Sequence, residues 1–258
     1  MRTVVACLAS VVAIGACTGD DGTVPSAPTG RNAPTVEVLG QNLELLPGIQ
    51  NAFRVGFEPR GSSVDIIVTA RPDTARITIC PLGSVDDALP AVTSCRRDLP
   101  SGVRESVGRP GFGGVAIILD GDDAVSADLF VGYPEAGRAL AIRMPVLQSG
   151  SPGGTCDDNA CNPFFELRPT RGGPFDARAT WDGPEATLVL LQGRVLGRAQ
   201  TATGLPYVEA ARADGSAPLG IDTTMSAPGE YALVFRHRAQ RSGDDVMRDV
   251  RIDASWPG

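Results

Sequence analysis

The residue best suited to acid–base chemistry in this 258-residue chain is its single histidine, His237. A Ser–His–Asp triad would have to use this histidine, yet the chain contains no Gly-x-Ser-x-Gly motif that would present a serine nucleophile. In an extended strand His237 shares a face with Leu233 and Phe235, at the rim of a hydrophobic core. We therefore expect a structural role for His237 and predict no catalytic residue.

Acidic residues gather in three short polar segments, at positions 120–123, 157–159 and 243–245. Asp and Asn favour turns, because their side chains bond to the nearby backbone and they tolerate left-handed geometry. Ca²⁺ also binds carboxylate and turn carbonyl oxygens, although none of the segments has EF-hand spacing. Turn formation is the favoured interpretation, no cofactor is predicted, and the calcium candidates are Asp120, Asp122, Asp123, Asp244 and Asp245.

Six cysteines are present, and four of them are candidates for disulfide bonds: Cys80, Cys95, Cys156 and Cys161. An even number of cysteines in an exported protein indicates two disulfides. Three pairings are open, and Cys80–Cys95 with Cys156–Cys161 keeps each bond within one sequence neighbourhood. A four-thiolate zinc site is the alternative, but Cys80 and Cys95 lie too far apart in the sequence for its usual paired spacing.

The N-terminus has the charge and hydropathy of an export signal. Arg2 precedes an apolar run, residues 4–16, that is too short to cross a bilayer as a helix. The run ends in Ile-Gly-Ala followed by Cys17, which resembles the lipobox of bacterial lipoproteins. The resemblance implies cleavage before Cys17 and acylation of that cysteine, including palmitate, so that several chains anchor the protein in the membrane.

Two alternatives concern this N-terminal segment. An ordinary signal peptide with a coincidental cysteine would leave the protein without an anchor. If Cys17 is acylated, the residue after it bears on the choice of membrane. That residue is Thr18, not the Asp that retains some lipoproteins in the inner membrane. The expected location is therefore the cell envelope, with the outer membrane favoured in a cell that has two.

Composition divides the chain into five parts. A signal peptide (1–16) is followed by a flexible tether rich in Gly, Pro, Ser and Thr (17–34). A first β-sandwich domain (35–147) and a second one (163–258) flank a linker with a small disulfide loop (148–162). Each sandwich has an ordinary domain size.

Apolar and polar residues alternate with period two in both domains, which predicts half-buried strands. We therefore expect an all-β protein with two tandem antiparallel β-sandwich, jelly-roll-like domains. Short helical turns are expected at 86–89 and 208–213. The residues predicted to face the core are Phe53, Val64, Ile66, Val68, Ala70, Phe175, Ala177, Ala179 and Trp181.

The two halves resemble each other. Residues 60–79 align without gaps on residues 171–190, and residues 110–118 resemble residues 228–235. These landmarks occur in the same order, which favours a tandem repeat. The second half also resembles the bacterial pre-peptidase C-terminal type of β-sandwich, on Ala-Thr-Leu-Val-Leu-Leu (186–191) and on residues 227–235. That resemblance implies an accessory domain of secreted enzymes and envelope proteins.

The formal net charge of −7 argues against a nucleic-acid partner, because phosphate binding needs a basic surface. The prediction is a lipid-anchored envelope protein that acts as a non-catalytic binding, adhesion or scaffolding module. Its candidate partners are the membrane, other envelope proteins and glycan. The alternatives are an accessory or catalytic subunit of a secreted hydrolase acting on envelope glycan or protein, and a subunit of an envelope complex held through an exposed sheet edge.

Overall fold

The computed structural model describes residues 36–57, 64–108, 110–133, 138–148, 162–169, 171–193, 208–226, 229–237 and 246–257. In these segments the chain forms sixteen β-strands and two short 3-10 helices, η1 (Ile49–Asn51) and η2 (Val92–Ser94), without an α-helix. Among the same residues no helix is long and apolar enough to cross a membrane. The all-β prediction is confirmed.

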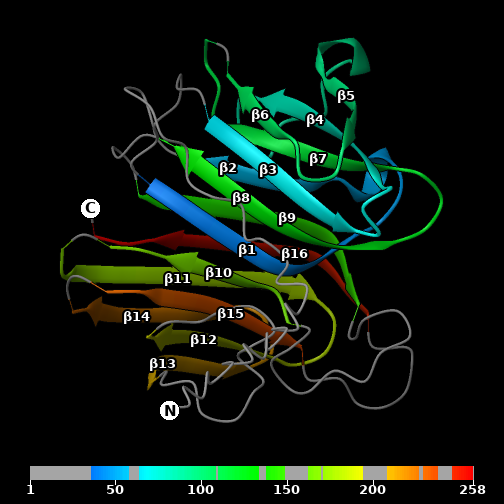
Figure 1. Cartoon of the computed structure of the whole chain (residues 1–258). Helices are drawn as coiled ribbons and strands as arrows, with labels where there is room; N and C mark the ends of the chain where they lie inside the picture. The colour runs from blue at the N-terminus through cyan, green and yellow to red at the C-terminus, as the bar shows by residue number, and fades with distance from the viewer. Residues whose placement is uncertain are drawn as a thin grey trace, which may run out of the picture.

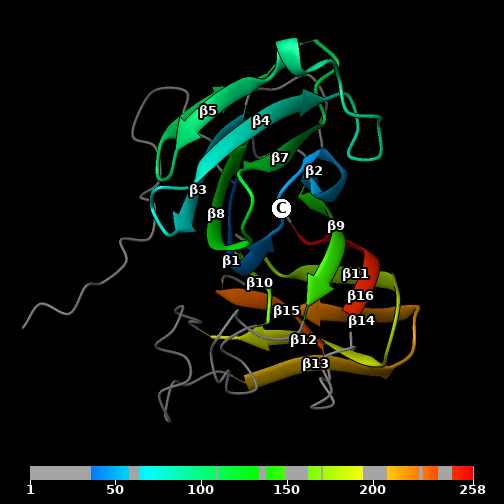
Figure 2. The ribbon, with the colours of Figure 1, turned by 90° about the vertical axis from the view of Figure 1, so that its right-hand side faces the viewer.

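The strands form two eight-stranded sheets, called sheet A and sheet B (Figures 1 and 2). In spatial order, sheet A consists of β13 (Val208–Gly215), β12 (Ala186–Gln192), β15 (Tyr231–His237), β10 (Phe164–Leu167), β1 (Val36–Leu45), β8 (Val125–Tyr133), β3 (Val64–Arg71) and β6 (Arg104–Val107). Sheet B consists of β14 (Leu219–Met225), β11 (Gly173–Asp182), β16 (Val246–Ser255), β9 (Ala139–Gln148), β2 (Phe53–Phe57), β7 (Gly114–Asp120), β4 (Arg76–Leu82) and β5 (Arg96–Pro100).

The predicted strand phases are confirmed. All nine residues expected in the core are buried, from Phe53 through Trp181. In β11 the outward residues Asp176, Arg178 and Thr180 alternate with buried apolar ones. Because each sheet buries one face against the other, period-two alternation is what this packing requires.

Each half of the molecule has the strand order of a jelly roll. In the first half (β1–β9), β1-β8-β3-β6 of sheet A faces β2-β7-β4-β5 of sheet B, with β9 added beside β2. In the second half (β10–β16), β10-β15-β12-β13 faces β11-β14, with β16 added beside β11. The orders match strand for strand, except that the described second half has no counterpart of β4 and β5. The molecule is therefore a tandem of β-sandwiches.

The halves are joined edge to edge through both sheets. In sheet A, β1 pairs antiparallel with β10, and in sheet B, β9 pairs antiparallel with β16 from Ala139↔Ser255 to Gln148↔Val246. One large buried cluster runs through both halves and includes Leu140 and Phe165. The linker predicted at 148–162 thus separates two sandwiches that share their sheets and their core.

The gap-free alignment of residues 60–79 with 171–190 does not match this topology. It superimposes β3 on β11, whereas the strand order equates β3 with β12 and β2 with β11. Likewise residues 110–118 include most of β7, whereas residues 228–235 include most of β15. By strand order the counterpart of β15 is β8, not β7. The alignment is wrong by one strand because every half-buried strand has the same period, so a shift by one strand leaves the apolar phases in agreement.

Three further sequence predictions have a structural outcome. The disulfide Cys80–Cys95 is present, with an S–S distance of 2.04 Å, and it joins β4 to the residue just before β5. Residues 208–213 are not helical but form most of β13, because they pair with β12 along its whole length. Residues 86–89 form turns and irregular structure. The lipobox cysteine Cys17 and the predicted pair Cys156–Cys161 lie outside the described residues.

Candidate functional site: a groove where the two halves meet

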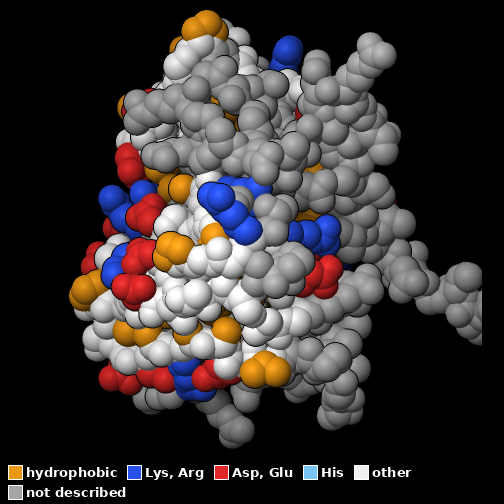
Figure 3. Space-filling model, turned by 90° about the vertical axis from the view of Figure 1, so that its left-hand side faces the viewer, with side chains coloured by type: hydrophobic (Ala, Val, Ile, Leu, Met, Phe, Trp, Pro, Cys, Tyr) orange, Lys and Arg blue, Asp and Glu red, His pale blue; other side chains and the backbone are white. Residues whose placement is uncertain are grey.

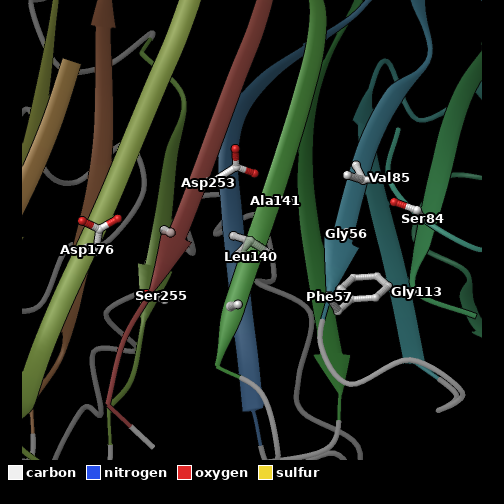
Figure 4. Close-up of a pocket in the computed structure, with 12 residues that line it drawn as sticks. Gly56, Phe57, Ser84, Val85, Gly113, Leu140, Ala141, Asp176, Asp253 and Ser255 are labelled. Atoms are coloured by element: carbon white, nitrogen blue, oxygen red, sulfur yellow. The ribbon is translucent and has the colours of Figure 1, made fainter. Parts of the chain in front are cut away.

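A groove of about 300 Å³ crosses the outer face of sheet B where the two halves meet. It is formed by β11, β16, β9 and β2 and by the loop after β4, and Figure 4 shows carboxylates on one side and Phe57 and Val85 on the other. The lining residues are Gly56, Phe57, Ser84, Val85, Gly113, Ala139, Leu140, Ala141, Asp176, Asp253, Ala254 and Ser255.

Small residues form the floor of the groove. Ala141, Gly56 and Gly114 are cross-strand neighbours in β9, β2 and β7. A Cβ at Gly56 would lie 2.7 Å from the Cβ of Val85, and one at Gly114 would lie 2.9 Å from the carbonyl oxygen of Val55. Both distances are too short for real contacts, so glycine at 56 lets the loop after β4 approach the sheet and glycine at 114 leaves room for the backbone of β2.

The loop after β4 forms one wall of the groove and is held by hydrogen bonds. Arg54 on β2 donates through Nη1 to the carbonyl oxygens of Asp87 at 2.7 Å and of Val85 at 3.3 Å. The backbone N–H of Ser84 donates to the Asp87 carboxylate at 2.7 Å, which closes the loop on itself. The position of Ser84 and Val85 in the wall therefore depends on an arginine from the sheet below.

Arg143 on β9 ties this wall to the opposite half. Its Nε donates to the carboxylate of Asp86 and its Nη1 to the carboxylate of Asp253, each at 2.9 Å. Burial lowers the pKa of Arg143, but its hydrogen bonds to both carboxylates outweigh burial and raise the pKa above its ordinary value. The hydrogen bond from Arg143 in turn lowers the pKa of Asp86. A largely buried cation thus joins the first half's loop to a strand of the second.

The other rim of the groove is polar and comes from the second half. The side chains of Asp176 and Asp253 are about half exposed, at 47% and 58%. Asp176 forms an ion pair with Arg178, with 2.9 Å between Nη2 and Oδ2. Across the sheet, Asp176 lies opposite Ser255 of β16 and Asp222 of β14. Figure 3 shows acidic and basic side chains intermingled along this margin of the molecule. Carboxylate and hydroxyl oxygens therefore face solvent beside an apolar wall.

The groove continues toward Trp256, close to the C-terminus. A second hollow shares Asp176 and Ser255 with the groove and extends over Pro174, Asp222 and Trp256. Five neighbouring strands, from β14 to β2, line the combined surface, and at about 4.8 Å between strands it spans roughly 19 Å. An elongated polar ligand can lie across the strands on such a surface.

The residues predicted from sequence to carry chemistry lie elsewhere. Asp120 accepts a hydrogen bond from the Thr78 hydroxyl at 2.6 Å, and Asp122 and Asp123 are exposed. Within the described ranges no three His, Cys, Asp or Glu side chains lie close enough to hold a metal ion. Asp244 and Asp245 lie outside the described residues. The backbone of His237 ends β15 opposite Ala186.

Sequence inspection did not single out the residues of the groove. Asp176, Arg143 and Asp253 belong to no sequence motif. Groove residues from Gly56 to Ser255 are spread over most of the chain and form no local motif. Their juxtaposition depends on β9 pairing with both β2 and β16.

No family model matches this chain, and no curated protein matches it. Among solved structures, the chain is similar to the N-terminal CBM22-1-CBM22-2 tandem domain of Xyn10C from Paenibacillus barcinonensis, at 12% identity and a TM-score of 0.26, covering 85% of this chain and 78% of that one. Vicilin from Corylus avellana is similar at 9% identity and a TM-score of 0.23, with coverages of 81% and 74%. The protein YhaK from Escherichia coli follows at 12% identity and a TM-score of 0.19, with coverages of 85% and 84%. The fold assignment rests on the strand order described above.

Proposed function

We propose that this protein is a lipid-anchored cell-envelope protein that binds glycan chains in the groove on sheet B without cleaving them. The observation that carries the proposal is the groove itself, an elongated surface with a floor of small residues and a rim of carboxylates and hydroxyls. Neither half could build it alone, because the wall comes from the first half and the carboxylates from the second.

The chemistry of the rim suits polyhydroxylated ligands. Sugar hydroxyls donate hydrogen bonds, and a carboxylate such as Asp176 or Asp253 accepts two of them at once. Ala139 and Ala141, which are partly exposed in the groove, offer an apolar surface for the C–H faces of a sugar ring, and the buried side chains of Phe57 and Val85 support the wall beside them. Since the rim is acidic, neutral or amine-bearing glycans fit better than polyanionic ones.

The anchoring part of the proposal rests on the N-terminal sequence. An apolar run followed by Ile-Gly-Ala-Cys17 supports cleavage before Cys17 and its acylation. The disulfide Cys80–Cys95 agrees with an oxidising compartment outside the cytoplasm. Intact-mass analysis of protein from membranes tests this part: we expect a chain that begins at Cys17 and carries acyl adducts, and an unmodified chain that begins further on would refute it.

Glycan binding is tested with groove variants of the full chain. Glycan-array screening first identifies a retained glycan, and titration calorimetry then compares Asp176→Asn and Asp253→Asn with the unchanged protein. Each variant should lose about tenfold in affinity, because hydrogen bonds to a charged acceptor are stronger than neutral ones. Asp122→Asn, in an exposed turn away from the groove, serves as the matched control.

Two outcomes would overturn the proposal. The first is that no glycan is retained, or that Asp122→Asn weakens binding as much as the groove variants do. The second is that new reducing ends appear when the retained glycan is incubated with the protein, which would favour the hydrolase alternative.

A further inference from the structure

The free edge of β14 differs from the other three sheet edges. β14 has seven residues and pairs with β11 in unbroken register from Leu219↔Ala179 to Met225↔Gly173. On its other side no strand of the described chain pairs with it, so a row of backbone N–H and C=O groups is available there. Its only charged residue is Asp222, and no proline or bulge interrupts it.

The other edges carry features that oppose strand addition. In β5 the pairing register shifts, Asp98 has a positive φ of 55°, and the strand ends in Pro100. β6 has only four residues. β13 also has a register shift, and its Arg212 forms ion pairs with Asp214 and with Glu209, the latter at 3.7 Å. Among the described strands, β14 is thus the regular edge that lacks such features.

The first half shows what occupies the equivalent edge. The counterpart of β14 is β7, and its outer side is covered by β4, which pairs with it antiparallel over seven residues. That pairing places Arg76 of β4 opposite Asp120 of β7. No strand of the described second half takes the place of β4.

Charge indicates what kind of strand the edge would accept. Asp222 is exposed and lies directly opposite Asp176 of β11, an unfavourable like-charge pair. Asp176 has Arg178 as its partner, whereas Asp222 forms no ion pair within the described part of the chain. A basic side chain on an added strand would compensate Asp222 as Arg76 faces Asp120 in the first half.

We propose that the free edge of β14 binds an extended segment of a partner protein by strand addition, with a lysine or arginine of that segment opposite Asp222. Main-chain hydrogen bonds supply the affinity and the basic side chain sets the register. This interaction uses the backbone along the edge of β14, and the only side chain it shares with the proposed glycan surface is Asp222.

The probe is a synthetic peptide with the sequence of β4, residues 76–82, in which serine replaces Cys80 and arginine replaces Thr78, so that this arginine lies opposite Asp222 when residues 76–81 pair with residues 219–224. Fluorescence anisotropy measures its binding to the full chain, and amide chemical shifts locate it. In an extended peptide the N–H groups of alternate residues point to opposite sides, so methylating every second nitrogen removes the donors on one side only. One methylated series should bind like the parent peptide and the other at least about tenfold more weakly.

A charge exchange tests the register. Asp222→Lys should weaken binding of the parent peptide about threefold and strengthen binding of a peptide with glutamate instead of arginine at position 78, whereas Asp122→Lys should change neither. The proposal is overturned if the peptide does not bind, if both methylated series bind alike, if the shifts map to another edge, or if the charge exchange has no effect.

Discussion

The two halves of the molecule share a strand order but finish sheet B differently. The first half extends it beyond β7 with the hairpin of β4 and β5, held by Cys80–Cys95, whereas the described second half ends at β14. The hairpin both covers the edge of β7 and, through its loop, forms the wall of the groove. This hairpin therefore gives the first half a binding surface, whereas in the described second half the edge of β14 has no neighbouring strand.

The groove shows how a tandem can build an asymmetric site. The first half supplies the loop around Val85, and the second supplies Asp176 and Asp253. Arg143 binds Asp86 of the first half and Asp253 of the second, so the site's electrostatics also cross the junction. Substitutions in the core, in the β4–β5 hairpin and in the groove can show whether the halves act as one unit and which features depend on the hairpin.

The largest effect is expected from a core truncation in the second half. Phe235 is fully buried and packs edge-on against Trp181, with 5.2 Å between ring centroids. Phe235→Ala should lower the free energy of unfolding by about 3–5 kcal/mol. Because the halves share both sheets and a core, calorimetry should show one transition that moves to lower temperature as a whole, while Thr180→Ala on the surface barely shifts it. Two separate transitions would show that the halves unfold independently.

Removing the disulfide of the β4–β5 hairpin comes next. The double substitution of Cys80 and Cys95 by serine opens a loop with a sequence separation of 15 residues, which should cost about 3 kcal/mol in unfolding experiments. The same change at Cys156 and Cys161 should cost about 2 kcal/mol, because the loop is shorter. Thiol titration of the unreduced, unfolded chain checks both pairs, and free thiols in the second would contradict that pairing.

Filling the groove floor should have an intermediate effect. Gly56→Ala forces the loop after β4 away from the sheet, with an expected loss of about 1–3 kcal/mol and weaker glycan binding. Adding Val85→Gly should restore part of the loss, because it removes the Cβ that clashes. In the second half Gly220→Ala meets only the end of the flexible Arg178 side chain, so a loss equal to that at Gly56 would contradict the packing argument.

The smallest effect is expected at the ion pair of the wall. Asp86 is about half exposed, so Asp86→Asn should cost only about 0.5 kcal/mol. Arg143 lowers the pKa of Asp86 below its ordinary value of 3.8 in the folded state. The stabilisation is therefore complete above that value and is lost as the pH falls through the lower folded pKa. Urea denaturation from pH 7 to pH 3 should show the two proteins converging in acid, and a constant difference would contradict this assignment.

Several features of the molecule could be predicted from its residues. Alternation from Val64 to Ala70 and from Phe175 to Trp181 identified half-buried strands and their inward faces. The short separation of Cys80 and Cys95 identified a disulfide. Local signals of this kind depend only on period and spacing along the chain.

The sequence by itself determined the fold class, the inward face of many strands and one disulfide, because these follow from alternation and from the spacing of cysteines. Only the tertiary structure decided which strands are neighbours, since all half-buried strands share one period and an alignment shifted by one strand looks equally good. The groove and the free edge of β14 follow from that neighbourhood: Val85, Ala141 and Asp253 meet only because β9 lies between β2 and β16. The site belongs to the pairing of strands distant in sequence, where no local pattern can reveal it.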